Sequence, residues 1–212
     1  MYVRQVEDQK LTFRVSGKLW MRSLVMSDLE TDTEWSHLLG RGMDGALKGK
    51  TLTPLISDMV TWDVWKREYP ETTALNMSQT SKNYSREFYR EPTQFVFGFK
   101  AIGKPWSLAM DQMLKRPVHQ FELGDEPLLA TFDERGTVTH LFSRDIGGQT
   151  LDFEQVDGLT MKDHQTSSHW SMITGSATAG AMKGIRLTPH VGIMSYRKAW
   201  KNFHPDSSDI AF

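Results

Sequence analysis

The chain contains an internal duplication, in which residues 26–72 return in altered form as residues 161–207. At an offset of 135 positions, 17 of the 47 aligned residues are identical without a gap. The identities concentrate on Trp, Gly and Pro, and they include Trp35 on Trp170, Gly45-Ala46 on Gly180-Ala181, Leu52-Thr53-Pro54 on Leu187-Thr188-Pro189, and Trp65-Lys66 on Trp200-Lys201. A repeat of this kind constrains the architecture before any other feature does. The sequence therefore predicts two related modules.

Upstream of these segments the offset becomes 140, which places Arg4 on Arg144, Gln9 on Gln149, Leu11 on Leu151 and Phe13 on Phe153. The change of offset gives the first copy five extra residues between Phe13 and Met26. The second copy also has a leader, roughly residues 95–140, without a counterpart in the first. We therefore expect module 1 over residues 1–75, a polar linker or long loop over 76–93, and module 2 with its leader strand and helix over 94–212.

The local patterns predict a mainly β (α+β) fold of antiparallel strands with a few short helices. Alternating or short apolar runs predict strands over 11–15, 24–26, 50–56, 95–102 and 128–132, with a further strand opening at Trp35. Polar, Gly-containing segments predict hairpin turns at 27–31 and 133–136. Short helices are predicted over 61–69, 106–114 and 195–203. Thr61 and Ser195 would cap the two repeated helices, and Pro70 and Pro205 would stop them. Because each module is small, we expect the two to pack together and share a core.

Composition excludes several classes of protein. The longest apolar runs are too short to span a membrane. The net charge of −1, with acids and bases interspersed, argues against a nucleic-acid partner or an anionic membrane. The absence of cysteine excludes disulfides, thiolate metal sites and cysteine nucleophiles. The charged N-terminus does not resemble a signal peptide, so we expect the chain as given to be cytoplasmic.

Several spaced motifs resemble a known bacterial family. They are V-S-G-K-L-W, L-V-M-S-D-x-E-T-x-x-E-W-S, G-A-L-K-G-K-x-L-T-P and W-x-x-W-K-x-x-x-P-x-T, all within residues 4–72. This pattern is similar to that of the domain-of-unknown-function family 3179, and module 2 carries it more loosely. The resemblance implies no activity. Members of the family usually carry a C-P-x-C segment just before the position of Tyr2, and this chain lacks it. A longer parent could carry that segment and be exported.

Histidines are concentrated in module 2. His140, His164, His169, His190 and His204 lie in or just before the second copy, and their partners in the first copy, where these exist, are other residue types. Imidazole is a common metal ligand and general base, so His164 and His169 with Asp163 are candidate catalytic residues. His140, His164, His169 and His190 are candidate ligands of a divalent metal. The alternative is that these histidines are scattered over turns and the surface. His164 and His169 can converge only if a turn lies between them.

The pairs Asp28-x-x-Thr31 and Asp163-x-x-Thr166 occur in both copies ahead of a tryptophan. Each aspartate could be a catalytic or metal-binding carboxylate. The simpler interpretation is a turn whose Asp and Thr oxygens accept hydrogen bonds from the local backbone. The repeated tryptophans likewise favour a core role. The non-repeated Trp20, Trp62 and Trp106 are the candidate ligand-binding aromatics.

Two functions remain open at this point. In the first, the chain is a non-catalytic module that binds a small ligand or acts as a scaffold. In the second, module 2 is a metal-assisted or histidine-based hydrolase of a small ester or lactone.

Overall fold

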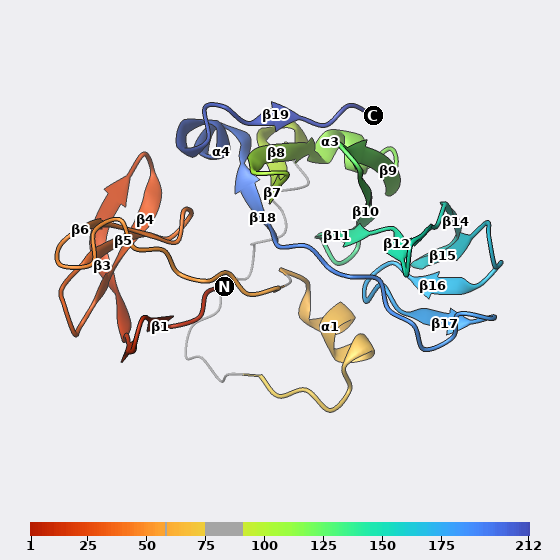
Figure 1. Cartoon of the computed structure of the whole chain (residues 1–212), viewed down its shortest axis with the longest axis horizontal. Helices are drawn as coiled ribbons and strands as arrows, with labels where there is room; N and C mark the ends of the chain where they lie inside the picture. Colours follow the sequence, from red (N-terminus) through yellow and green to blue (C-terminus); the bar gives the residue numbers. More distant parts are fainter. Residues whose placement is uncertain (58, 75–90) are drawn as a thin grey trace. The chain divides into compact units, whose positions relative to one another are not determined.

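The computed structural model describes residues 1–57, 59–74 and 91–212. Most of the regular structure is antiparallel β-sheet with a few short helices, which confirms the predicted mainly β class (Figure 1). The contacts divide the chain into two compact units. The first unit comprises Met1–Ser57 and Lys198–Asp206, and the second comprises Asp58–Arg197 and Ser207–Phe212.

The first unit is built on a four-stranded antiparallel sheet in which neighbouring strands follow one another along the chain. Its strands are β3 (Phe13–Trp20), β4 (Ser23–Asp28), β5 (Glu34–Ser36) and β6 (Arg41–Asp44). A short ribbon of β1 (Gln5–Val6) and β2 (Gln9–Lys10) precedes the sheet. The unit is completed by most of α4 (Arg197–Phe203), which comes from the far end of the chain.

The second unit contains the same sheet and the same ribbon, built from the second copy. The sheet is β14 (Phe153–Asp157), β15 (Thr160–Asp163), β16 (His169–Ser171) and β17 (Ala177–Ala179). The ribbon is β12 (Asp145–Ile146) and β13 (Gln149–Thr150). Trp35 pairs with Met26 and Gly42, and Trp170 pairs with Met161 and Ala177, so the strand registers agree at the offset of 135. The duplication seen in the sequence is therefore a duplication of structure.

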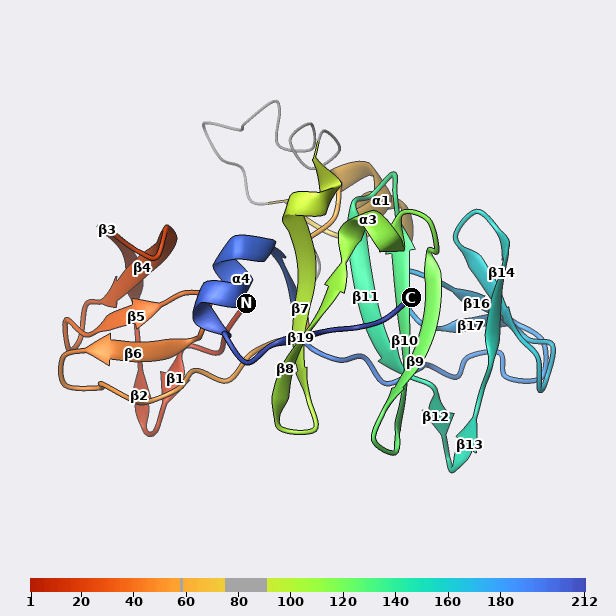
Figure 2. The same cartoon turned by 90° about the horizontal axis from the view of Figure 1, so that it is seen from above.

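The leader of module 2, together with two strands from the C-terminal end of the chain, forms two further sheets in the second unit. One contains β18 (Gly192–Tyr196), β7 (Phe95–Ala101), β8 (Lys104–Ala109) and β19 (Ser208–Asp209) in that order. The other contains β11 (Val138–Ser143), β10 (Glu126–Asp133) and β9 (Val118–Leu123). Helix α3 (Met110–Met113) follows β8, and a 3₁₀ turn, η1 (Pro92–Gln94), precedes β7. Figure 2 shows the strands of both sheets standing next to one another.

Buried apolar side chains form separate clusters that follow this arrangement. The largest cluster joins the two leader sheets and includes Phe97, Phe99, Leu108, Leu128 and Phe132. The two repeated sheets have matching clusters at equivalent positions. Leu11, Trp35 and Leu52 form the centre of one, and Leu151, Trp170 and Leu187 lie in the other. Each repeated sheet thus has a buried centre within its own unit.

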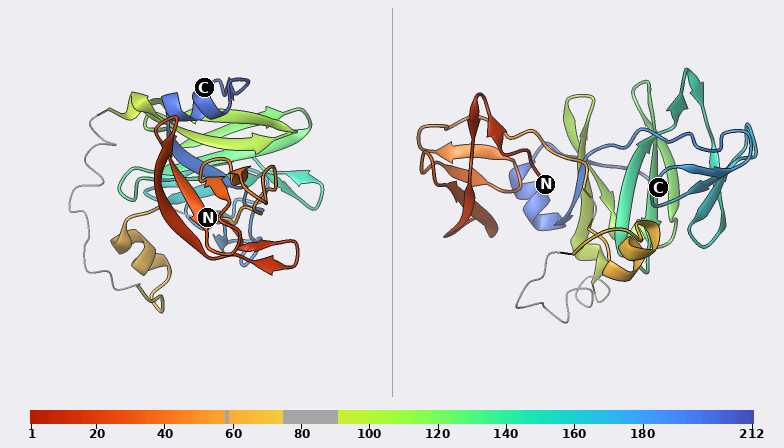
Figure 3. Two further views of the ribbon diagram at one scale, coloured as in Figure 1. Left: turned by 90° about the vertical axis from the view of Figure 1, so that its left-hand side faces the viewer. Right: turned by 90° about the horizontal axis from the view of Figure 1, so that it is seen from below.

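Helix α1 (Trp62–Glu68) lies in the second unit although it belongs to module 1. Val64 shares a buried cluster with Val138 and Ile173. The backbone N–H of Thr61 donates to the carbonyl of Gly136 at 3.1 Å, which fixes the start of the helix to the β10–β11 turn. Figures 2 and 3 both show this helix (gold) beside the β10–β11 hairpin.

Two predicted elements were wrong. The segment 106–114 is not one helix, because Trp106 pairs with Phe99 in β8 and only Met110–Met113 is helical. The apolar side chains there alternate across a sheet that buries Leu108, and this pairing outweighs the helical tendency. The segment 50–56 makes isolated bridges at Thr51 and Pro54 instead of a strand. Pro54 has no N–H to donate to a ladder.

The predicted helix caps were also wrong in their chemistry. Thr61 occupies the N-cap position of α1, but its side chain makes no capping hydrogen bond there. Ser195 lies in strand β18, and the helix of module 2 starts at Arg197.

The hairpin turn at 133–136 is confirmed, since Asp133 accepts hydrogen bonds from the N–H groups of Arg135 and Gly136. Most of the expected linker lies outside the described residues. The module boundaries and the packing of the modules against one another stay predictions.

Candidate functional site

The repeated aspartate of module 1 lies at the centre of a closed network of hydrogen bonds. Asp28 ends β4 and is fully buried. Its carboxylate accepts hydrogen bonds from the N–H of Thr31 at 2.6 Å, from the hydroxyl of Thr31 at 2.9 Å and from the indole Nε1 of Trp35 at 2.8 Å. The hydroxyls of Thr31 and Thr33 bond to one another at 2.7 Å, and Thr33 Oγ1 accepts from the N–H of Leu47. The carboxylate therefore ties a turn to the core tryptophan.

Module 2 repeats this network residue by residue. Asp163 is fully buried and accepts hydrogen bonds from the hydroxyl of Thr166 at 2.8 Å, the N–H of Ser168 at 3.0 Å and the indole Nε1 of Trp170 at 2.9 Å. The backbone N–H of Thr166 also donates to it. Ser168 takes the place of Thr33 and accepts from the N–H of Met182 at 3.0 Å. Both aspartates thus accept hydrogen bonds from the local backbone and from a core indole.

The electrostatics of the two sites agree with this role. Burial by itself raises the pKa of a carboxyl group, because water no longer solvates the charge. In Asp28 the opposing hydrogen bonds from Trp35 and Thr31 outweigh burial and hold the pKa below its ordinary value. In Asp163 the hydrogen bonds from Trp170 and Thr166 do the same. Both groups are therefore ionised, and the donors of the fold already occupy their oxygens.

Trp35 and Trp170 are core residues. Trp35 and Trp170 are fully buried, and each ring meets a phenylalanine edge to face. The centroid distance is 5.7 Å for Trp35 with Phe13 and 5.7 Å for Trp170 with Phe153. The identical geometry supports a structural role for both indoles.

The candidate histidines are distributed over several elements of the second unit. His164 follows β15, and its Nε2 lies 3.7 Å from a carboxylate oxygen of Glu154 on β14. His169 lies on β16, so a turn does separate it from His164. His140 is buried on β11 and stacks on Phe142. The backbone N–H of His190 donates to the carbonyl of Leu141 at 2.7 Å, and its ring Nε2 lies 3.4 Å from a carboxylate oxygen of Glu126.

These histidines do not gather into a metal centre with acidic residues. Among residues 1–57, 59–74 and 91–212, no group of three or more His, Asp or Glu side chains is arranged to hold a metal ion. Each of His164 and His190 is instead paired with a single glutamate. Asp163, the carboxylate next to His164 in sequence, is directed into the core toward Trp170.

The three candidate aromatics differ in their surroundings. Trp106 packs against the largest core cluster, and its indole Nε1 donates to the carbonyl of Ala101 at 3.1 Å. Trp20 lies at the end of β3 and meets Phe203 edge to face, with ring centroids 4.8 Å apart. Trp62 is exposed on α1. Trp20 and Trp62 are both exposed, and Trp62 is the more exposed of the two.

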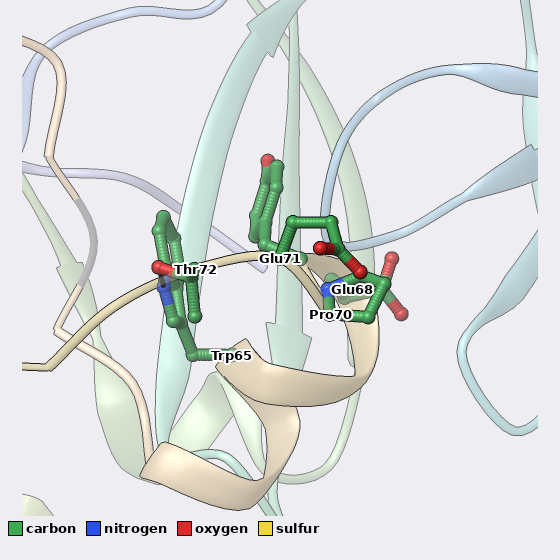
Figure 4. Close-up of a pocket in the computed structure, with 6 residues that line it drawn as sticks. Trp65, Glu68, Pro70, Glu71 and Thr72 are labelled. Carbon is green, nitrogen blue, oxygen red and sulfur yellow. Dashed lines mark hydrogen bonds between the residues drawn. The ribbon is translucent and has the colours of Figure 1, made fainter.

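A shallow open hollow lies at the C-terminal end of α1. It is lined by Trp65, Glu68, Tyr69, Pro70, Glu71 and Thr72, and its volume is about 410 Å³ (Figure 4). In Figure 4 Trp65 and Thr72 lie at one end of the hollow, and Glu68 and Glu71 lie toward the other. The hollow therefore combines an aromatic wall with two carboxylates.

The aromatic wall is held in place by local contacts. The indole Nε1 of Trp65 donates to Thr72 Oγ1 at 3.0 Å. The rings of Trp65 and Tyr69 are 4.3 Å apart and tilted by 36°. The ammonium group of Lys66 donates to the carbonyl of Pro70, which closes the turn after the helix. Thr72 and Tyr69 thus orient the indole.

Module 2 has the same aromatic pair in a buried setting. The rings of Trp200 and His204 are 4.2 Å apart and tilted by 45°, which matches Trp65 and Tyr69 at the offset of 135. Trp200 and His204 are both buried, whereas Trp65 and Tyr69 are partly exposed. The position of Glu68 is occupied in module 2 by Phe203, which is also buried. The hollow is therefore a feature of module 1.

Sequence reasoning did not identify Glu68, Tyr69, Glu71 or Thr72 as site residues. The repeat predicts a core role for Trp65, which is wrong, because Trp65 is partly exposed whereas Trp200 is buried. One difference between the copies does indicate the hollow. Module 1 has charged Glu68 where module 2 has apolar Phe203, close in sequence to a tryptophan that both copies keep.

Comparisons with known proteins point to one family. The family model described as protein of unknown function, DUF3179, matches residues 1–94 and again residues 89–207. The two matches correspond to the two copies of the duplication. No curated protein and no solved structure matches the chain. No helix in the part of the chain that the structure describes is long and apolar enough to cross a membrane.

Proposed function

The chain belongs to the DUF3179 family, and from its own geometry we propose that it is a non-catalytic binding module for a small cationic ligand. The ligand would carry an organic ammonium group, such as a quaternary amine or a basic side chain. It would bind in the hollow at the end of α1, against the aromatic pair of Trp65 and Tyr69, with the carboxylates of Glu68 and Glu71 at the other end of the hollow.

The observation that carries this proposal is the difference between the two modules at equivalent positions. Module 2 buries its Trp200–His204 pair and places Phe203 beside it, as a core requires. Module 1 keeps the tryptophan but leaves it partly exposed and replaces the phenylalanine by Glu68. A partly exposed aromatic pair beside two acids does not contribute to a core, and this supports a binding role.

The chemistry of the lining favours a cation over a neutral or acidic ligand. A cation above an indole face gains roughly 0.5–1 kcal/mol at an exposed site and about 2 kcal/mol when it is desolvated. Glu68 and Glu71 both line the hollow, and their carboxylates attract a cation as well. An anion would meet the repulsion of both acids.

Calorimetric titration with choline tests this proposal. The neutral isostere 3,3-dimethylbutan-1-ol has the same shape and no charge, so it is the matched ligand control. We expect choline to bind and the alcohol to bind at least about five-fold more weakly, which corresponds to about 1 kcal/mol. Equal binding of the two ligands, or no binding of choline, would contradict the proposal.

Variants localise the site. Trp65→Leu and the double variant Glu68→Gln/Glu71→Gln should each weaken choline binding by about five-fold or more. Trp62→Leu is the matched control, because Trp62 is an exposed indole on the same helix outside the hollow. It should leave the affinity unchanged.

The alternative of a histidine-based or metal-assisted hydrolase in module 2 has no comparable support. His164 and His169 lie on either side of a turn, and the carboxylate of Asp163 is occupied by donors of the fold. His140, His164, His169 and His190 as metal ligands therefore stay a prediction. Metal analysis of the purified protein would test it directly.

A further inference from the structure

Residues 208–212, called the strap below, lie against the two leader sheets of the second unit. They open with β19, whose two residues pair in parallel with β8 (Figure 1). The N–H of Ile210 then donates to the carbonyl of Ser107 at 2.9 Å. The side chain of Ile210 is buried in the largest core cluster, and Phe212 packs against the same cluster. The strap therefore belongs to the core that joins the two leader sheets.

Polar contacts of Asp209 hold the first part of the strap. Its carboxylate accepts a hydrogen bond from the buried hydroxyl of Ser107. The guanidinium group of Arg197 lies 3.8 Å from the carboxylate of Asp209 and 3.7 Å from that of Asp111. Ion pairs between partly exposed side chains contribute less than about 1 kcal/mol each. The end of the strap depends on a different contact.

A buried histidine binds the end of the strap. His119 lies on β9, and only 5% of its surface is exposed. Its Nε2 lies 2.8 Å from the carbonyl oxygen of Ala211. Because a carbonyl oxygen only accepts hydrogen bonds, Nε2 carries the hydrogen and donates it. The ring stacks on that of Phe212, with centroids 4.1 Å apart and planes tilted by 15°, and it lies 5.5 Å from the ring of Phe121. His119 thus contacts both of the last two residues of the strap.

The surroundings of His119 favour its neutral form. Burial removes the water that would solvate a charged ring, and the positive charge of Arg116 adds repulsion, so the pKa of His119 lies below its ordinary value. The hydrogen bond to Ala211 acts in the opposite direction without reversing the shift. The rings stacked on His119 are phenylalanines, and its partner on β10 is Ala130. The acidic side chain of the strap, Asp209, is bound at β8 instead.

We infer that the strap is a pH-sensitive element of the fold, held on the leader sheets while His119 is neutral and released once His119 is protonated. Release opens one face of the imidazole ring to water, which solvates the charged form. The state that binds a proton more readily gains population as the pH falls. Since the folded pKa of His119 is lowered, the strap is bound at full strength above the ordinary histidine pKa of about 6.5 and less strongly as the pH falls below it.

Hydrogen exchange of the full-length protein, followed by NMR, tests the inference. The amide of Ile210 reports on the strap because it is bonded to Ser107, and the amides of β10 report on global unfolding. Between pH 7.5 and 5.5 the binding of the strap can weaken by at most about ten-fold, the limit set by a pKa of about 6.5 in the released state. We expect the protection of the Ile210 amide, corrected for intrinsic exchange, to fall by about two-fold to ten-fold, while β10 keeps its protection. Carboxyl groups ordinarily titrate at about pH 4, below this range.

Substitution of the histidine assigns the effect. His119→Gln keeps a donor for the carbonyl of Ala211 and cannot be charged, so the pH dependence should disappear. His164→Gln is the matched control, because His164 is an exposed histidine of the same unit whose ring is paired with Glu154. It should keep the pH dependence of the parent.

Three results would overturn the inference. They are a parent protein whose Ile210 protection does not change with pH, a loss shared equally by β10, and a pH dependence that survives in His119→Gln. NMR titration of the His119 ring in the parent protein provides a second test if the variant disturbs folding. Its midpoint should lie below about 6.5, and a midpoint at or above that value would also contradict the inference.

Discussion

At the scale of single residues, the fold depends on two buried carboxylates. Asp28 and Asp163 each accept hydrogen bonds from a threonine and a core indole. A hydrogen bond to a charged group contributes roughly 1.5–3 kcal/mol, and a buried donor left without its acceptor costs about as much. Such a network stabilises the turn only while the carboxylate is ionised. The two aspartates should therefore govern the stability of the chain in acid.

The direction of this pH dependence follows from the lowered pKa of each aspartate. The folded state binds the proton less readily than the unfolded state does. The stabilisation is present above the ordinary pKa of an aspartate, about 3.9, and it is lost as the pH falls through the lower folded pKa. We expect the free energy of unfolding from urea titrations to fall steeply below about pH 4.

Substitution of one carboxylate isolates its contribution. Asp28→Asn should lower the free energy of unfolding by roughly 3 kcal/mol at pH 7. The NH₂ group of asparagine is a donor, and it would face the N–H and O–H donors that surround Asp28. The loss should be smaller at pH 3. Asp32→Asn is the matched control in the same turn, since Asp32 forms an exposed ion pair with Arg14 and should contribute less than about 1 kcal/mol. Equal effects of the two substitutions would contradict the structural role of Asp28.

At the scale of elements, close approach of the backbone to an aromatic ring fixes the edge of each repeated sheet. A Cβ atom at Gly40 would lie 2.4 Å from the ring of Tyr2, and one at Gly175 would lie 2.6 Å from the ring of Phe142. Gly40 corresponds to Gly175 at the offset of 135, and Tyr2 corresponds to Phe142 at the offset of 140. Both glycines also adopt positive φ, at 60° and 66°. Only glycine fits these positions in both modules.

An alanine scan of two glycines separates steric overlap from backbone strain. Gly184 has a φ of 90° and no atom near a Cβ, so Gly184→Ala should cost only the strain, about 1–2 kcal/mol. Gly175→Ala should cost about 1–3 kcal/mol more, because the methyl group meets Phe142. Thermal unfolding of the two variants measures the difference. A smaller loss for Gly175→Ala than for Gly184→Ala would contradict the packing described for Phe142.

Elements with a strong local signal could be predicted from the sequence, and those decided by pairing could not. The hairpins around Ser27–Thr31 and 133–136 follow from turn residues, and the helix at 62–68 follows from its apolar spacing and Pro70. The segment 106–114 has both a helical and a strand tendency. Its first part forms strand β8 because Trp106 and Leu108 pair with residues of β7. That partner lies in a different part of the sequence, so local reasoning could not reveal it. Similarly, Ser195 has the chemistry of a cap, but its backbone pairs with Val96 in a sheet.

At the scale of the whole molecule, the duplication separates the residues that build the fold from those available for binding. Residues that both modules keep in the same setting, such as the Asp28 and Asp163 networks, build the two sheets. Trp65 and Trp200 are identical in sequence but differ in exposure, and this difference marks the hollow in module 1. The sequence alone could not reveal it, because the exposure of a side chain depends on the residues that pack around its helix, and these are distant in sequence. The enrichment of histidine in module 2 was visible in the sequence; in the described residues these histidines belong to different elements, and no group of three or more His, Asp or Glu is arranged to hold a metal ion.

Backbone amide spectra of isotopically labelled protein during a choline titration test the central claim most directly. We predict that the signals of Trp65, Glu68, Tyr69 and Glu71 shift together with a single affinity. The signals of Trp200 and His204, which are the buried counterparts in module 2, should stay in place. Shifts confined to His164, His169 or His190, or a titration without any shift, would contradict the assignment of binding to the hollow of module 1.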